Sequence, residues 1–427
     1  MIFIYKLISN LLYPVIIFLI FFRKIINKED KIRYKEKIFS KNFNIKRKSG
    51  SKLIWFHAAS IGELKSILPI LSEINKKQKD IEFLVTTITL TSANLAKEEF
   101  KNFKNVFHRF FPIDSEFLIK KFLKLWKPSA IFLVDSEIWP NLILVAKKNG
   151  IPLSLLNARI TTKTFKRWMI LNSFAKKIFN SFDLCLTSNN ETKVYLDKLN
   201  AKNIHFLGNI KLINYIDNRK LNIQNEDFLT KRRFWIAIST HSGEETLCLN
   251  VHLRLKKFYE NIKTIVAPRH VQRINDIKKL CESLKISYQI LDKNDLIDDS
   301  KEVILINSYG NLGIFLKYAK SVFIGKSTVK KLKHVGGQSP IDAAKMGCKI
   351  YHGPYIYNFS EIYGILKENN ISREIEGSGD LAKNLERDLR NMEKNEREIS
   401  DKINTLGIKT LNNTMQKIDN FLVNEII

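Results

Sequence analysis

Short apolar runs alternate with longer amphipathic segments along most of this chain, in two separate series. The first series lies at residues 53–57, 83–87, 130–134, 153–156 and 184–187. The second series lies at residues 235–239, 264–267, 303–306, 321–324 and 349–352. Continuous runs of Ile, Val, Leu and Phe are typical of strands buried on both faces, and amphipathic helices between them make parallel βαβ units. The pattern predicts an α/β protein with two Rossmann-like, doubly wound domains.

Composition changes mark where these domains begin and end. A chain of 427 residues is too long for one core. Residues 214–231 are polar, charged and poor in apolar periodicity, which favours a linker. Beyond Leu381 the chain is charged and helix-prone. The expected division is an anchor at 1–22, domains at 23–213 and 232–380 around the linker at 214–231, and a helical tail at 381–427.

The amino terminus is the most apolar part of the chain. Residues 7–22 read LISNLLYPVIIFLIFF, and residues 1–5 extend that character. About 22 helical residues at ~1.5 Å each would reach roughly 33 Å, the thickness of a hydrocarbon core. Lysines and arginines follow from Arg23 onwards, and no small-residue cleavage site does, which argues against a signal peptide. We expect a membrane-anchor helix with the rest of the chain in the cytoplasm. Both a spanning helix and an in-plane anchor fit the sequence.

The charge balance points to an anionic partner. Lys+Arg number 71 and Asp+Glu 43, a net charge of +28, which suits nucleic acid, phospholipid or a phosphorylated substrate. A general compositional bias towards lysine, asparagine and isoleucine is an alternative explanation for the excess of basic residues. The four cysteines lie far apart and the eight histidines show no metal-binding spacing, so we expect no metal site.

The first strand of each series leads into a similar turn. Residues 57–63 read HAASIGE and residues 239–244 read STHSGE. Each places Ser, Gly and Glu at a strand-to-helix junction, where backbone N–H groups and the helix dipole favour negative charge. Open α/β sheets bind ligands at the carboxyl ends of their strands, which makes Glu63 a candidate functional residue. A glutamate that only stabilises the helix start is the simpler interpretation of Glu63.

Further polar motifs follow other predicted strands. Asp135 and Glu137 follow the strand at 130–134, where they suit a cap, an ion pair or a metal-binding D-x-E. Lys211 ends the first half in GNIK. In the second half, PRH at 268–270, SYGNL at 308–312 and GGQSPIDAA at 336–344 follow strands. An arginine can bind a phosphate or carboxylate with two hydrogen bonds, and glycine-rich amides can hold a phosphate.

Taken in order, these motifs resemble one family. SIGE, TTIT at 86–89, FPID at 111–114, SEIWPN, NAR at 157–159, GNIK, STHSGEE, PRH and GGQSP are together similar to the bacterial 3-deoxy-D-manno-octulosonic acid (Kdo) transferases that act on lipid A precursors. The resemblance runs from about residue 1 to 370. It implies a GT-B architecture, two Rossmann-like domains facing a cleft, with the lipid acceptor on the first and the donor CMP-Kdo on the second.

The resemblance also implies roles for individual residues. Glu63 would be the general base of an inverting transfer, and Glu137 and Lys211 would stabilise the transition state. CMP would contact Pro268, Arg269, Tyr309, Gly310, Asn311, Ser339, Pro340, Ile341 and Asp342. No metal or other cofactor is implied. The partners would be CMP-Kdo, a lipid A precursor and the anionic inner membrane, not nucleic acid, with the catalytic domains on the cytoplasmic face.

These roles are chemically reasonable. A carboxylate can take the proton of an acceptor hydroxyl, and Lys211 and Arg269 can meet the negative charge of the donor. The chain departs from the family at three places. Asn311 replaces a glutamate, Gln338-Ser339 and Asp342 replace His-Asn and a glutamate, and the loop at 326–335 is longer and more basic.

Two alternatives are open at this stage. One is a glycosyltransferase that uses another nucleotide sugar, with Asp135 and Glu137 on a divalent cation. The other is a basic membrane-surface protein without enzymatic activity, which binds anionic lipid or nucleic acid through its lysines.

Overall fold

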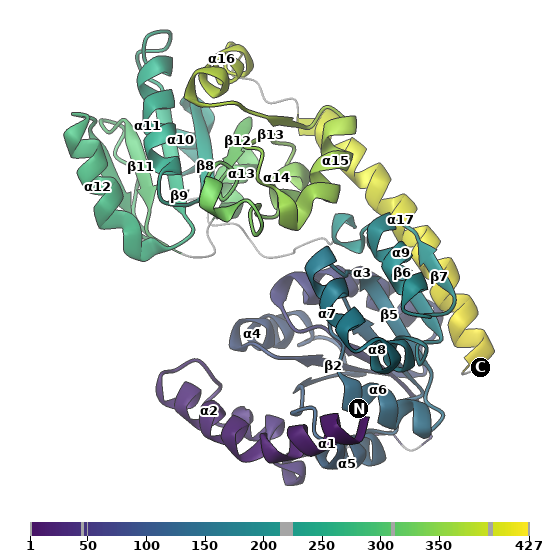
Figure 1. Cartoon of the computed structure of the whole chain (residues 1–427). Helices are drawn as coiled ribbons and strands as arrows, with labels where there is room; N and C mark the ends of the chain where they lie inside the picture. The colour runs from purple at the N-terminus through teal and green to yellow at the C-terminus, as the bar shows by residue number, and fades with distance from the viewer. Residues whose placement is uncertain are drawn as a thin grey trace. The chain divides into compact units, whose positions relative to one another are not determined.

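The computed structural model describes residues 2–43, 47–48, 50–213, 225–308, 312–391 and 396–425. The chain splits into two compact units, which Figure 1 labels by their helices and strands. Unit 1 comprises Met1–Tyr215 and Gly407–Ile427, and unit 2 comprises Ile216–Leu406. Each unit contains one seven-stranded sheet in which all paired strands are parallel.

The sheet of unit 1 has the strand order β3-β2-β1-β4-β5-β6-β7. Its strands are β1 Lys52–His57, β2 Ile81–Thr87, β3 Val106–Phe110, β4 Ala130–Val134, β5 Leu153–Ala158, β6 Leu184–Thr187 and β7 Ile204–Phe206. The chain runs outwards from β1 through β2 to β3, then continues on the other side of β1 with β4. The order therefore reverses between β1 and β4, and this switch point is where open α/β sheets bind ligands.

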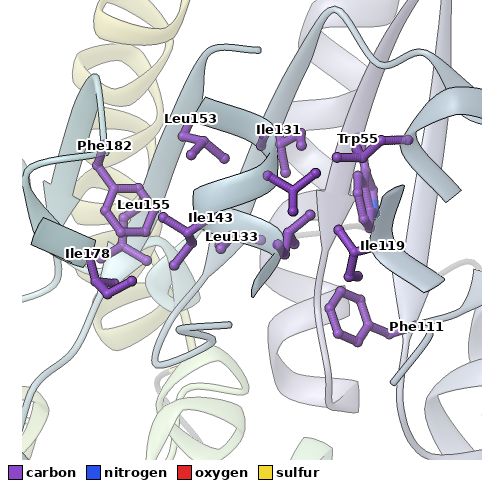
Figure 2. Packing of buried hydrophobic residues seen from close by; sticks show 14 of the residues in the cluster. Trp55, Phe111, Ile119, Ile131, Leu133, Ile143, Leu153, Leu155, Ile178 and Phe182 are labelled. Atoms are coloured by element: carbon purple, nitrogen blue, oxygen red, sulfur yellow. The ribbon is translucent and has the colours of Figure 1, made fainter. Parts of the chain in front are cut away.

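Helices cover both faces of this sheet. They are α1 Ile2–Leu11, α2 Tyr13–Ile25, α3 Ile61–Lys77, α4 Leu90–Glu99, α5 Glu116–Trp126, α6 Pro140–Lys148, α7 Thr162–Ile170, α8 Asn172–Phe179, α9 Asn190–Lys198 and the later part of α17 Glu396–Glu425, with 3-10 turns η1 Arg33–Lys37, η2 Ser40–Phe43 and η3 Ile210–Leu212. Alternate residues of β1 enter two cores. Trp55 packs with Ile119 of α5 and Phe111, as Figure 2 shows, whereas Phe56 packs in the core that contains α3 and α17.

The sheet of unit 2 has the order β10-β11-β9-β8-β12-β13-β14, so its switch point lies between β8 and β12. The strands are β8 Phe234–Thr240, β9 Lys263–Pro268, β10 Tyr288–Leu291, β11 Val303–Ile306, β12 Ser321–Ile324, β13 Lys349–His352 and β14 Ser372–Glu374. The helices are α10 Glu226–Lys231, α11 Glu244–Leu255, α12 Ile274–Ser283, α13 Leu312–Tyr318, α14 Ile341–Lys345, α15 Ser360–Glu368, α16 Ser378–Asp388 and the start of α17, with turns η4 Val271–Arg273, η5 Lys330–Leu332 and η6 Tyr357–Phe359.

The predicted fold class is confirmed: the structure has two parallel α/β sheets, and each of the ten predicted runs is a strand. The predicted linker and the predicted tail both contain helices. Residues 214–224 of the expected linker lie outside the described residues, and the remainder of that linker contains α10. The expected tail is not a separate segment, because apolar residues at helical spacing bury its two helices in different cores. Leu381 and Leu385 of α16 pack in unit 2, and Ile418 and Phe421 of α17 pack in unit 1.

The expected anchor consists of two helices, α1 and α2, bent by 45°. Among the described residues no single helix is long and apolar enough to cross a membrane. The two helices of this bent pair, taken together, are long and apolar enough. Phe3, Phe18 and Ile25 of the pair are at least 70% exposed. A role in membrane attachment therefore remains a prediction.

Candidate active site

Glu63 lies in the first turn of α3, directly after β1. Ser60 caps this helix: its Oγ accepts the Glu63 N–H at 3.5 Å and donates to Glu63 Oε1 at 2.8 Å. The Ala59 N–H donates to Glu63 Oε2 at 2.7 Å. The carboxylate thus caps its own helix, as the simpler interpretation of the sequence proposed. These bonds also fix the carboxylate at the switch point.

The surroundings of Glu63 make it a weak acid. The pKa of Glu63 is raised to about 7, mainly by burial; the hydrogen bonds from Ser60 and Ala59 lower it, and the negative charges of Asp135 and Glu137 raise it. A carboxylate with a pKa near 7 is an effective proton acceptor at neutral pH, whereas an ordinary glutamate is a much weaker base. Glu63 therefore has both a fixed position and the proton affinity of a general base.

Glu137 follows β4, the strand across the switch point from β1. Its Oε2 accepts a hydrogen bond from Trp139 Nε1 at 2.8 Å and contacts His57 Nε2 at 3.2 Å. His57 is the last residue of β1 and is fully buried. The Glu137 carboxylate is consequently held from two sides, by the indole that follows it and by the imidazole of the neighbouring strand.

Lys211 forms an ion pair with Asp135. Asp135 is the first residue after β4, and its φ of 63° lies in the left-handed region that few residues other than Gly, Asn and Asp adopt. Lys211 lies in η3, where its N–H donates to Asn209 Oδ1 at 3.0 Å, and the Ile210 N–H donates to Asn157 Oδ1 at 3.0 Å. Two asparagines therefore fix the turn that carries Lys211.

The structure thus brings the three predicted residues of the first domain, Glu63, Glu137 and Lys211, to one end of one sheet. Sequence reasoning missed the support that His57 and Trp139 give Glu137. Their positions offered a signal, because His57 ends β1 and Trp139 stands two residues after Glu137. Within the described ranges, no cluster of three or more His, Cys, Asp or Glu side chains is placed to hold a metal.

The corresponding junction of unit 2 is built differently. Glu244, the first residue of α11, is completely buried. It accepts the N–H groups of His241 at 2.9 Å, Lys326 at 2.6 Å, Ser327 at 2.9 Å and Thr328 at 3.0 Å, together with the Thr328 hydroxyl at 3.0 Å. The carboxylate therefore joins the turn after β8 to the loop after β12, and fills the switch point of this sheet.

Six of the predicted CMP-binding residues are described by the structure, in segments that follow strands β9 and β12 of unit 2. Pro268 is the buried last residue of β9, and Arg269 beside it is exposed. In the segment after β12, Pro340 and Ile341 are buried, whereas Ser339 and Asp342 are exposed at the start of α14. The other three, Tyr309, Gly310 and Asn311, lie outside the described residues. The assignment to CMP stays a prediction for all of them.

The fold and the site together define a two-domain α/β protein of the GT-B type, with a buried carboxylate at the switch point of one sheet. Solved structures share this fold. A putative UDP-N-acetylglucosamine 2-epimerase from Listeria monocytogenes is 13% identical, with a TM-score of 0.59 over 88% of this chain and 98% of that chain. A glycosyltransferase from Rickettsia africae is 12% identical, with a TM-score of 0.56 over 87% of this chain and 99% of that chain.

Sequence comparisons identify the family. Residues 33–214 match the family model described as 3-deoxy-D-manno-octulosonic-acid transferase (kdotransferase). The 3-deoxy-D-manno-octulosonic acid transferase of Rickettsia felis is 31% identical over 78% of this chain and 70% of its own length. Its counterpart in Rickettsia bellii is 30% identical over 92% of this chain and 93% of its own length. The chain belongs to the Kdo transferase family and is a glycosyltransferase, so the alternative of a non-enzymatic surface protein is set aside.

Proposed function

We propose that this protein transfers Kdo from CMP-Kdo to a lipid A precursor, lipid IV-A, with inversion at the anomeric carbon and with Glu63 as general base. The observation that carries the proposal is the Glu63 carboxylate, fixed at the β1–β4 switch point and raised in pKa to about 7. Membership of the Kdo transferase family supports Kdo as the transferred sugar. A general base supports the transfer because the acceptor hydroxyl must lose its proton.

The reaction has one proton to move. The acceptor hydroxyl attacks the anomeric carbon of Kdo, the bond to the phosphate oxygen of CMP breaks, and the hydroxyl proton passes to Glu63. Lys211 forms an ion pair with Asp135, and the charges of Asp135 and Glu137 act on the Glu63 carboxylate. These side chains share one end of the sheet. A lysine there can stabilise negative charge of the donor, and a carboxylate can stabilise positive charge that develops on the sugar ring.

We assign donor binding to unit 2. Arg269 is exposed directly after β9, where a guanidinium can bind a phosphate with two hydrogen bonds. Asp342 is exposed in the first turn of α14, and its carboxylate can accept from ribose hydroxyls. CMP carries a single phosphate, so we propose that no divalent cation is needed. In the metal-dependent alternative, Asp135 and Glu137 would have to leave Lys211, His57 and Trp139 to bind the cation.

We further propose that α1 and α2 attach the protein to the cytoplasmic face of the inner membrane. Their exposed apolar side chains and the basic residues that follow suit an interface of acyl chains and anionic headgroups. The Tyr5 hydroxyl donates to Asp114 at 3.0 Å, and Lys6 pairs with Glu116 at 3.0 Å. Because these bonds join α1 to unit 1, they favour an in-plane anchor over a spanning helix.

A single incubation tests the proposed activity. Detergent-solubilised protein is mixed with CMP-Kdo and lipid IV-A in the presence of EDTA, and the lipid product is identified by mass. A gain of one or more Kdo masses supports both the substrates and the independence from metal. Transfer that is abolished by EDTA and restored by Mg²⁺ would favour the metal-dependent alternative. Intact CMP-Kdo in both conditions would show that the donor is another nucleotide sugar.

A further inference from the structure

We infer that His57 is a positioning residue that orients Glu137 for the reaction, so that one carboxylate oxygen is held by the protein and the other faces substrate. This inference rests on the proposed function, because it concerns the residue opposite the base Glu63. Three observations carry it: the burial of the imidazole, the hydrogen bonds at both of its nitrogens, and the different environments of the two Glu137 oxygens.

The imidazole of His57 has a fixed orientation. It is fully buried and stacks on Phe111, with ring centroids 4.0 Å apart and an interplanar angle of 26°. The Trp139 ring meets it nearly edge-on, at 6.3 Å and 62°. A side chain this enclosed does not contact substrate. Its influence on the reaction must pass through Glu137, its partner at the partly exposed end.

Both ring nitrogens of His57 have polar partners. Nδ1 lies 2.9 Å from the Thr86 hydroxyl oxygen, which accepts the Trp55 Nε1 hydrogen at 2.9 Å, and 3.2 Å from the Thr86 carbonyl oxygen. Nε2 lies 3.2 Å from Glu137 Oε2. The imidazole is therefore held at one side by Thr86 of β2 and contacts the Glu137 carboxylate at the other.

The two oxygens of Glu137 are not equivalent. Oε2 receives the His57 and Trp139 donors, whereas in the described part of the chain no donor reaches Oε1. The side chain as a whole is 18% exposed. Oε1 is therefore the oxygen available to a substrate hydroxyl or to a developing positive charge. Removal of the His57 contact would leave the carboxylate freer to rotate.

Two substitutions at position 57 separate positioning from packing. His57→Phe keeps a ring against Phe111 and removes both nitrogens, whereas His57→Gln keeps an N–H donor. We expect His57→Phe to lower kcat for Kdo transfer about 10- to 100-fold, the effect of one hydrogen bond to a charged group, with KM for CMP-Kdo unchanged. His57→Gln, which keeps a donor at this position, should restore part of the rate.

Other results would overturn the inference. A His57→Phe enzyme with wild-type kcat would do so, as would an equal loss of kcat in both variants. If His57→Phe fails to fold by thermal melting, Thr86→Val decides the matter, since it leaves His57 in place and removes the hydroxyl that holds Nδ1. Its kcat should also fall, with KM for CMP-Kdo unchanged, and a wild-type kcat would refute the account. Absence of transfer by the wild type would instead refute the proposed function.

Discussion

The two strand-to-helix junctions at Glu63 and Glu244 share a sequence pattern and a place in the fold, yet they differ in chemistry. Both glutamates lie in the first turn of a helix at the switch point of a parallel sheet. Among the described residues, Glu63 receives hydrogen bonds only from Ala59 and Ser60, which lie just before it in the chain. Glu244 also receives three N–H groups and a hydroxyl from the loop after β12.

The difference lies in what the strand across the switch point supplies. In unit 1, β4 is followed by Asp135 and Glu137, whose negative charges add to the effect of burial in raising the pKa of Glu63. In unit 2, β12 is followed by backbone N–H groups, which satisfy a buried carboxylate. The same local motif thus gives a weakly acidic carboxylate in one sheet and a structural link in the other. The distinction depends on a partner more than 70 residues away in sequence.

The largest expected effect is on catalysis. Glu63→Gln preserves the shape and the acceptor of the capping bonds but removes the base, so kcat for Kdo transfer should fall about 10²- to 10⁴-fold. Glu244→Gln, the same substitution at the other junction, is the matched control. The rate is measured with saturating CMP-Kdo and acceptor, and folding is checked by circular dichroism. Near-normal transfer by a folded Glu63→Gln enzyme would contradict the role of Glu63.

The second prediction concerns stability, and here the larger effect is expected at Glu244. Glu244→Ala leaves several buried donors without an acceptor, each at a cost of about 1–3 kcal/mol, so unit 2 should lose several kcal/mol of stability. Hydrogen exchange should report it as faster exchange of the Ser327 and Thr328 amides. Glu63→Ala, as the control, should leave these amides protected. Equal protection in both variants would show that Glu244 does not hold the loop.

The third prediction sharpens the electrostatic comparison. Asp135→Asn removes one of the charges that raise the pKa of Glu63, and asparagine tolerates the left-handed backbone of position 135. Lys211, which loses its charged partner in this variant, also lowers the pKa of Glu63. The pKa of Glu63 should fall, and the acid limb of the kcat profile should move to lower pH by up to about one unit. An acid limb at the wild-type pH would mean that Asp135 does not tune the base.

The smallest expected effects come from the glycines of the two junctions. Gly243 has a φ of 95°, so Gly243→Ala should cost about 1–2 kcal/mol. Gly62 lies inside α3, and a Cβ added there meets no atom within 4 Å. Gly62→Ala should change the stability by less than about 1 kcal/mol, in the favourable direction. Urea denaturation measures both. A strongly destabilised Gly62→Ala would show that the two junctions are more alike than the structure indicates.

The sequence predicted the central strands and not the edge strands. The four missed strands, β3, β7, β10 and β14, are the outermost strands of the two sheets. Their middle residues are partly exposed, unlike the fully buried β4 and β12. A strand buried on both faces must be apolar throughout, whereas an edge strand can carry residues such as His108 and Arg373. Apolar runs therefore reveal only the interior of a sheet.

The candidate site was predicted in part, for a similar reason. Glu63, Glu137 and Lys211 follow strands or close a domain, so local pattern and family resemblance indicated them. The link from His57 to Glu137 and the pairing of Lys211 with Asp135 join residues about 80 positions apart. Such contacts depend on which strands are neighbours, and the order of strands in a sheet cannot be predicted from any single segment of the sequence.

The most direct test of Glu63 as the base is the pH dependence of kcat for Kdo transfer by the wild-type enzyme, measured from about pH 5.5 to 8.5 with EDTA present. The base must be deprotonated, and its pKa is about 7. We expect the rate to be constant above that pH and to fall about tenfold for each unit below it. A rate that stays constant down to pH 5.5 would contradict the account, because a base with an ordinary glutamate pKa would then perform the reaction.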